Sequence, residues 1–123
     1  RSLLRVQAVG FTSRVAQYMD SADLLVSKPG GISITEAACK GVPMLLADLV
    51  GGCETRNQAF FADHGWAEPC DTDAIADSAL SLLADDARRQ ALVEAQRRDF
   101  DGQAAARIAD AVLCRCGRAP AAV

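Results

Sequence analysis

The stretch SKPGGISITE, residues 27–36, joins an apolar run to a helical pattern. The run before it, residues 23–27, is apolar without alternation, which is typical of a strand in a parallel sheet that is covered on both faces. A proline and two glycines then break the chain. A helix is expected from about residue 32 to residue 40, where Gly41 provides a C-terminal stop. The stretch therefore predicts a strand, a tight turn and a helix.

The same order of strand and helix continues along the chain. Apolar runs bounded by glycine or proline predict strands, and apolar residues spaced three and four apart predict helices. The expected ranges are a strand at 5–11, a helix at 12–21, a strand at 43–47, a helix at 54–64 with Phe60 and Phe61 toward the core, and a strand at 66–69. From residue 72 the pattern is helical, with a break near Asp85 and a last helix after Gly102. The fold class is therefore α/β, with a three-layer Rossmann-like parallel sheet of about four strands and a helical C-terminal end.

The composition excludes several classes of function. The 123 residues fit one domain, and half of them are hydrophobic, as in ordinary globular proteins. A formal net charge of -3 offers no bulk attraction for nucleic acid, so no nucleic-acid partner is expected. No apolar run reaches the length of about 18 residues that a membrane-spanning helix needs.

The cysteines do not predict a metal site. Their number is odd and their spacing is irregular, at Cys39, Cys53, Cys70, Cys114 and Cys116. The chain has one histidine, His64, which is expected to cap the end of a helix. Free thiols in a reducing compartment are the expectation, with no metal and no cofactor.

The turn at residues 28–31 has the physical character of an anion site. A helix that begins just after a strand presents free backbone N–H groups and the positive end of its dipole. Gly30 and Gly31 allow a phosphate to approach the backbone closely, Lys28 adds positive charge and Ser33 adds a hydroxyl. Glu36 follows one turn later, where its carboxylate can accept hydrogen bonds from ribose. The residues alone leave open a plain strand-to-helix turn with Glu36 as a solvated side chain.

A longer run carries a resemblance to a known family. The run SKPGGISITEAACKGVPMLLADLVGGCETRNQAFFADHGWA, residues 27–67, resembles the C-terminal domain of family 28 glycosyltransferases. It looks most like the monogalactosyldiacylglycerol synthases and the processive diacylglycerol glycosyltransferases, which carry S-K-P-G-G-x-T-x-x-E-A, then G-x-P-M, then G-Q-E-x-x-N. The match runs from about residue 9 to residue 67. It implies a GT-B architecture, in which two Rossmann-like domains flank a cleft and the C-terminal one binds a UDP-sugar.

The resemblance implies a role for each matching position. Uracil would meet the turn at residues 10–12, the diphosphate would meet the start of the helix, and the ribose hydroxyls would meet the acidic side chain. The nucleotide-binding residues expected are Gly10, Phe11, Thr12, Lys28, Gly30, Gly31, Ser33 and Glu36. For Phe11, a place in the core as a buried aromatic side chain stays open.

The donor sugar would lie near Cys53, Glu54 and Asn57. Cys53 stands where the family usually has glutamine, and a thiol is a poor substitute in hydrogen bonding to sugar hydroxyls. For Asn57, a surface amide is the open alternative. No catalytic residue is predicted, because the base would come from the acceptor domain. No metal is expected, because helix dipole and backbone donors would stabilise the leaving UDP.

The function expected is that of a glycosyltransferase donor domain. It would bind a UDP-sugar for hexosyl transfer to a lipid acceptor such as diacylglycerol, and would be inactive without the acceptor domain. The alternatives are a non-catalytic nucleotide-sugar-binding or interaction module, or part of a UDP-sugar 2-epimerase. A phosphoacceptor receiver domain is excluded, because Asp48 follows Lys28 whereas that class places its aspartate first.

The resemblance also predicts the organisation of the chain. Residues 1–116 would form the donor domain without its first strand–helix units, and residues 117–123 would form a flexible tail. The missing units would leave an exposed sheet edge, at which a homodimer or another partner would pair. The expected location is cytoplasmic, peripheral at the inner face of the membrane.

Overall fold

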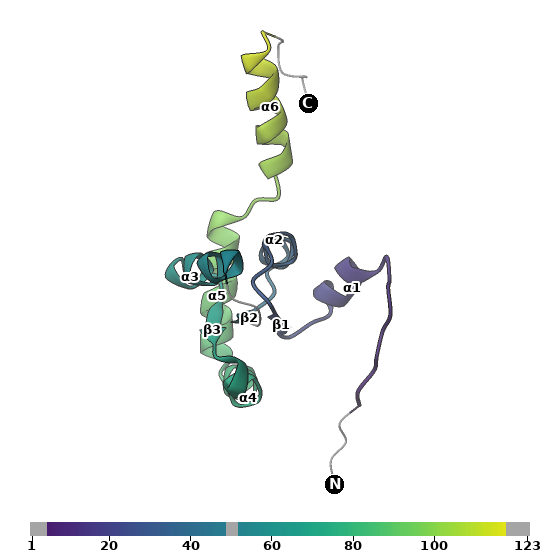
Figure 1. Ribbon diagram of the computed structural model, residues 1–123, viewed down its shortest axis with the longest axis vertical. Helices are drawn as coiled ribbons and strands as arrows, with labels where there is room; N and C mark the ends of the chain where they lie inside the picture. The colour runs from purple at the N-terminus through teal and green to yellow at the C-terminus, as the bar shows by residue number, and fades with distance from the viewer. Residues whose placement is uncertain (1–4, 49–51, 118–123) are drawn as a thin grey trace.

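The computed structural model describes residues 5–48 and 52–117. At its centre lies a three-stranded parallel sheet of β1 (Leu25–Ser27), β2 (Met44–Ala47) and β3 (Glu68–Cys70), in that order (Figure 1). The register places Val26 opposite Leu45. The α/β class and the parallel sheet are confirmed.

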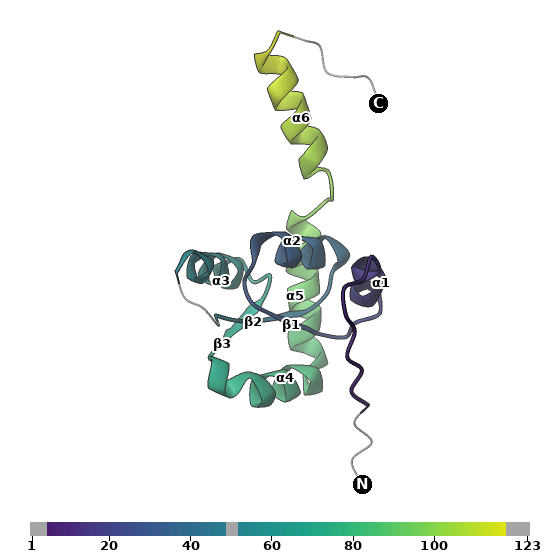
Figure 2. The same ribbon diagram turned by 45° about the vertical axis from the view of Figure 1, so that its right-hand side comes forward.

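Helices cover both faces of the sheet. The helices α2 (Gly31–Lys40) and α3 (Cys53–Asp63) lie on one face, and α4 (Ile75–Ala84) lies on the other (Figure 2). The long helix α5 (Asp86–Asp99) packs against both α2 and α4 and so joins the two layers. The remaining elements are α1 (Val15–Asp20), the 3₁₀ helix η1 (Thr72–Ala74) and α6 (Ala104–Arg115).

The central strand explains the apolar run without alternation. All four residues of β2 are buried, because a parallel strand with helices on both faces has no solvent side. Met44 and Leu46 belong to the core cluster that includes Ile34 and Trp66, and Leu45 is equally buried. The core therefore lies on both faces of the central strand, and the cluster on one face includes residues of α2.

The predicted strand at residues 5–11 is wrong. In the described structure this segment pairs with no strand and lies exposed, with Val6 91% accessible and Phe11 fully accessible. The sheet therefore has three strands instead of about four. A strand is stabilised by ladder hydrogen bonds to a neighbour, and an apolar pattern in the sequence does not guarantee that neighbour.

Only one of the two adjacent phenylalanines in α3 faces the core. Phe61 is buried, whereas Phe60 is 54% exposed and places its ring edge-on to Trp66, with 5.5 Å between centroids. Successive helical residues point about 100° apart, so both side chains cannot face one core. His64 does end the helix as predicted: its Nδ1 lies 2.7 Å from the carbonyl oxygen of Phe60 and donates to it.

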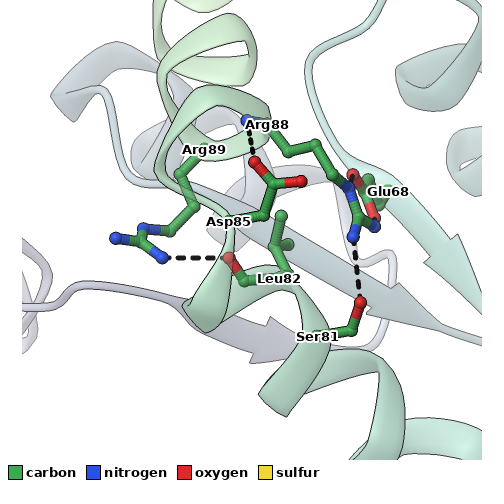
Figure 3. Close-up of polar contacts among 6 residues, drawn as sticks. All are labelled: Glu68, Ser81, Leu82, Asp85, Arg88 and Arg89. Atoms are coloured by element: carbon green, nitrogen blue, oxygen red, sulfur yellow. Dashed lines mark hydrogen bonds and ion pairs between the residues drawn. The ribbon is translucent and has the colours of Figure 1, made fainter.

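The predicted break near Asp85 is confirmed, and its chemistry is visible in Figure 3. The carboxylate of Asp85 caps α5 by accepting from the backbone N–H of Arg88 at 3.0 Å. The Arg88 guanidinium donates to Ser81 at 3.0 Å and pairs with Glu68, the first residue of β3. Arg89 donates to the carbonyl of Leu82 at 3.0 Å. These contacts fix the corner between α4 and α5 against the sheet.

The buried polar side chain Gln96 ties α5 to the loops that enter the sheet. Its Nε2 donates to the carbonyl of Val42 at 2.9 Å and to that of Trp66 at 2.7 Å. Replacing it by leucine (Q96L) leaves both buried carbonyls without this donor, so the free energy of unfolding should fall by about 1–3 kcal/mol in urea denaturation. The control Q90L changes an exposed glutamine of the same helix and should shift stability by less than about 0.5 kcal/mol. Equal losses in the two variants would contradict this role.

The last helix stands apart from the rest of the described structure (Figures 1 and 2). None of the residues of α6 is buried, and Gly102, with φ of 72°, turns the chain into it. Just before this helix, the carboxylate of Asp101 accepts from the backbone N–H of Gln103 at 2.9 Å, and its hydrogen bond to Arg107 holds its carboxyl pKa down to about 2. In the part of the chain that the structure describes, no helix is long and apolar enough to cross a membrane. Of the predicted tail at 117–123, residues 118–123 lie outside the described residues.

Candidate functional site

The loop between β1 and α2 has a shape fixed by its own hydrogen bonds. The carbonyl of Lys28 accepts from the hydroxyl of Ser27 at 2.9 Å and from the backbone N–H of Gly30 at 2.8 Å. Pro29, between them, is fully buried. The loop is therefore a rigid support for the helix that follows it.

Helix α3 holds the same loop from the side. The Asn57 amide donates to the carbonyl of Pro29 at 3.0 Å, and Lys28 Nζ lies 2.6 Å from Glu54 Oε1. Asn57 is half-buried, and its contact with the donor sugar stays a prediction beside the alternative of a helix-surface amide. The fold thus brings together the lysine predicted to bind phosphate and two residues predicted near the donor sugar.

The N-terminus of α2 is open and uncapped. Its N-cap, Gly30, is extended with φ of -75° and ψ of 123°, and no side chain caps the helix. The first intrahelical bond runs from Ile34 N–H to the Gly30 carbonyl, so the N–H groups of residues 31–33 have no acceptor within the helix. Ile32 is 79% exposed and Ser33 is exposed, so the first turn of the helix lies at the surface. Free donors at the positive end of a helix form a ready site for an anion.

Within the described residues, neither glycine is required by its backbone angle or by a close neighbour. Neither has a positive φ. A Cβ on Gly30 would lie 3.6 Å from Lys28 Nζ, and one on Gly31 would lie 3.9 Å from the Asn57 amide nitrogen, which are ordinary contact distances. Gly31, in the first turn, also gives up helix propensity relative to alanine, whereas Gly30 is the N-cap, where glycine is a favoured residue. Gly31 is best explained by close approach of something outside the chain.

Glu36 lies on α2 one turn after Ser33, as the sequence predicted. Its side chain is exposed, and in the described part of the chain its carboxylate makes no ion pair. It is placed to accept hydrogen bonds from a polar group lying along the helix. Its predicted role with ribose stays a prediction.

The turn at residues 10–12 is not drawn into this site by the described contacts. Phe11 is fully exposed, so its alternative role as a buried core aromatic is wrong. Thr12 accepts from the backbone N–H of Arg14 at 3.1 Å, a bond local to the start of α1. Contact of Gly10, Phe11 and Thr12 with uracil therefore stays a prediction.

The cysteines contribute little to the described site. Cys53 begins α3, but its side chain lies outside the described residues, so its effect on sugar recognition stays a prediction. Cys39, Cys70, Cys114 and Cys116 are free thiols. Burial, aided by nearby Asp71, raises the pKa of the Cys70 thiol and so disfavours its reactive form. Within residues 5–48 and 52–117, no three His, Cys, Asp or Glu side chains gather to hold a metal ion.

Sequence reasoning did not find the pairing of Lys28 with Glu54. The two residues lie 26 positions apart, and nothing in the periodicity of either segment links them. They meet because parallel β1 and β2 set α2 and α3 side by side on one face. The sequence offered one hint of the pairing: Lys28 and Glu54 have opposite charges, and each lies in or beside a glycine-containing loop that follows a strand.

Comparison with known families gives one match over most of the chain. Residues 4–99 match the family described as "Glycosyl transferases group 1". The match covers β1, β2, β3 and the loop at residues 28–31, and it ends where α5 ends. No solved structure matches the chain.

Three of the similar proteins carry the printed name processive diacylglycerol beta-glucosyltransferase. The protein of Bacillus licheniformis is 39% identical over 83 residues, which are 67% of this chain and 22% of that protein. The one of Bacillus subtilis is 37% identical over the same shares, and that of Staphylococcus carnosus is 33% identical over 77% of this chain and 24% of its own length. The resemblance to this group, inferred from residues 27–67, is confirmed. The chain spans about a quarter or less of the length of these relatives.

Proposed function

We propose, because this chain belongs to the group 1 glycosyl transferases, that its open α2 N-terminus binds the diphosphate of a UDP-sugar donor. The observation that carries the proposal is the uncapped start of α2 behind two glycines that no contact among the described residues requires. Lys28 adds the only charge-assisted donor of the loop at residues 28–31. The free N–H groups and Lys28 together fit an anion of high charge better than a neutral ligand.

Each part of the donor has a proposed place. The diphosphate lies against the N–H groups of residues 31–33 and the Ser33 hydroxyl, and the ribose hydroxyls donate to Glu36. The donor sugar lies toward the start of α3, where Glu54 and Asn57 are found. Uracil lies against the turn at residues 10–12. The relatives' printed name supports glucose as the first sugar to test.

The proposed reaction transfers a hexosyl group to a hydroxyl of a lipid such as diacylglycerol, with an acceptor domain of the kind that the resemblance implies. The acceptor oxygen bonds to the anomeric carbon, and the bond from that carbon to the β-phosphate oxygen breaks. The electron pair of that bond stays on UDP, and the hydroxyl proton passes to a base that is not assigned to any described site residue. We assign stabilisation of the leaving UDP to the helix N–H groups and Lys28, with no metal.

A single methyl group at Gly31 tests the donor site. The change G31A should leave stability unchanged or raise it by up to about 1 kcal/mol, because alanine has the higher helix propensity. The same methyl blocks close approach of the diphosphate, so affinity for UDP should fall about tenfold or more by isothermal titration calorimetry.

The matched control is V112A, which also raises helix propensity but lies on α6, away from the loop. It should leave the affinity for UDP unchanged. Failure of the unaltered chain to bind UDP would overturn the proposed function. Equal affinity of the G31A variant and the unaltered chain would remove the glycine argument from it.

A further inference from the structure

We propose that Lys28 exchanges partners during the binding cycle, pairing with Glu54 in the free site and with the terminal phosphate in the bound one. Glu54 thereby acts against retention of UDP. This inference rests on the proposed function and adds a regulation of the same site. It starts from the placement of both charges at the mouth of the anion site.

The two side chains meet next to Gly30, with 2.6 Å between Lys28 Nζ and Glu54 Oε1. A Cβ on Gly30 would lie 3.6 Å from Lys28 Nζ and 3.8 Å from Glu54 Oε1, so ammonium and carboxylate both stand over the glycine that precedes α2. An anion that reaches the free N–H groups of α2 must pass close to both. It is attracted by one and repelled by the other.

The pair is unequally solvated. The Lys28 side chain is 55% exposed, whereas that of Glu54 is 27% exposed. Glu54 Oε2 is fully buried and has no hydrogen-bond partner among the described residues. The carboxylate therefore depends on Lys28, while Lys28 is free to turn toward another anion. Losing that partner costs free energy, because a partly buried carboxylate is left uncompensated.

The presence of the Glu54 carboxylate disfavours binding of UDP more than binding of a UDP-sugar. The terminal phosphate of UDP is a monoester whose second ionisation is near pH 6, so it carries an extra negative charge at neutral pH. In a UDP-sugar that oxygen is esterified to the sugar and carries no such charge. Repulsion from Glu54 therefore rises when the sugar leaves. As UDP departs, Glu54 recovers Lys28.

A static brace predicts the opposite sign. If Glu54 only held Lys28 in its binding position, neutralising Glu54 would release the lysine and weaken UDP binding. If Glu54 competes with the phosphate, the same change strengthens UDP binding. The direction of one affinity change therefore separates the two readings.

The experiment is calorimetric titration of the 123-residue chain with UDP and with UDP-glucose, for the unaltered chain and for E54Q, K28M and E68Q. We expect E54Q to lower the Kd for UDP about threefold to tenfold, and to change the Kd for UDP-glucose by less. K28M should raise the Kd for UDP about tenfold or more. The control E68Q breaks the Arg88–Glu68 pair of Figure 3. The Glu68 side chain is about as exposed as that of Glu54, but it lies at the start of β3, away from the loop at residues 28–31. E68Q should therefore leave both Kd values unchanged.

Failure of the inference and failure of the proposed function give different results. If the unaltered chain binds UDP but E54Q binds it equally or more weakly, the exchange is overturned and the donor site stands. If the unaltered chain does not bind UDP, the proposed function itself fails. An equal or larger gain for UDP-glucose overturns the role in release. The second variant E54A, with circular dichroism to verify folding, must shift UDP binding in the same direction as E54Q, since both remove the charge.

Discussion

Replacing Trp66 by alanine (W66A) is expected to lower the free energy of unfolding by about 3–5 kcal/mol. Its ring is buried, lies 4.7 Å from that of Phe100 and 5.2 Å from that of Phe61, and so joins α3 to the end of α5. Its indole N–H donates to Asp99 at 2.7 Å. Truncation leaves a cavity between three elements and removes the indole hydrogen bond from Asp99, whose carboxylate keeps its ion pair with Arg98. A loss of this size is a large fraction of the about 5–15 kcal/mol that stabilises a typical domain.

The measurement is urea denaturation followed by far-ultraviolet circular dichroism. The control F60A removes an aromatic ring of the same cluster that is 54% exposed, and its expected loss is about 1 kcal/mol or less. Because the two rings touch, both variants remove the contact between them, and only W66A empties the core. Equal losses would show that the junction is not held by burial of Trp66.

The change E36A is expected to weaken UDP binding about tenfold to a hundredfold. Hydrogen bonds to a charged acceptor are worth about 1.5–3 kcal/mol, and the proposed ribose site depends on this one carboxylate. The sharper readout is specificity. The unaltered chain should prefer UDP over 2′-deoxy-UDP, and E36A should bind the two nearly equally, because the group that reads the ribose hydroxyl is gone.

The matched control is E94A, which removes an exposed glutamate from α5 and leaves α2 intact. It should keep both the affinity for UDP and the preference for ribose. A full ribose preference in the E36A variant would place the ribose elsewhere and contradict the assignment. The stability of the E36A chain should change little, since its side chain is exposed and unpaired within the described structure.

Local patterns sufficed wherever the fold depends on neighbours in sequence. The strand, turn and helix around residues 27–40, the stop at Gly41 and the break at Asp85 were all predicted, because caps, glycines and periodicity act within a few residues. The strand at 5–11 failed because strand formation depends on a partner far along the chain. The prediction that Phe60 faces the core was wrong for a geometric reason, since the neighbouring Phe61 occupies the core side of α3.

The features of the candidate site also fall into those that local sequence predicts and those that depend on distant segments. The free N–H groups at the start of α2 and the place of Glu36 one turn later follow from the strand–turn–helix pattern alone. Glu54 and Asn57 entered through the family resemblance, which places them near the sugar. Their contacts with Lys28 and Pro29 were not predictable, because they arise only when two helices are laid side by side on one sheet.

Trp66 has one more consequence, since it is the only tryptophan in the chain. Its indole is stacked on the His64 ring at 4.4 Å and bonded to Asp99, so its fluorescence reports on the junction of α3 with α5. The loop at residues 28–31 contains no aromatic residue and so has no fluorescence of its own. Emission therefore follows the loosening of the helical end, while calorimetry follows the nucleotide. Tryptophan emission and calorimetry thus report separately on the folding of the α3–α5 junction and on nucleotide binding.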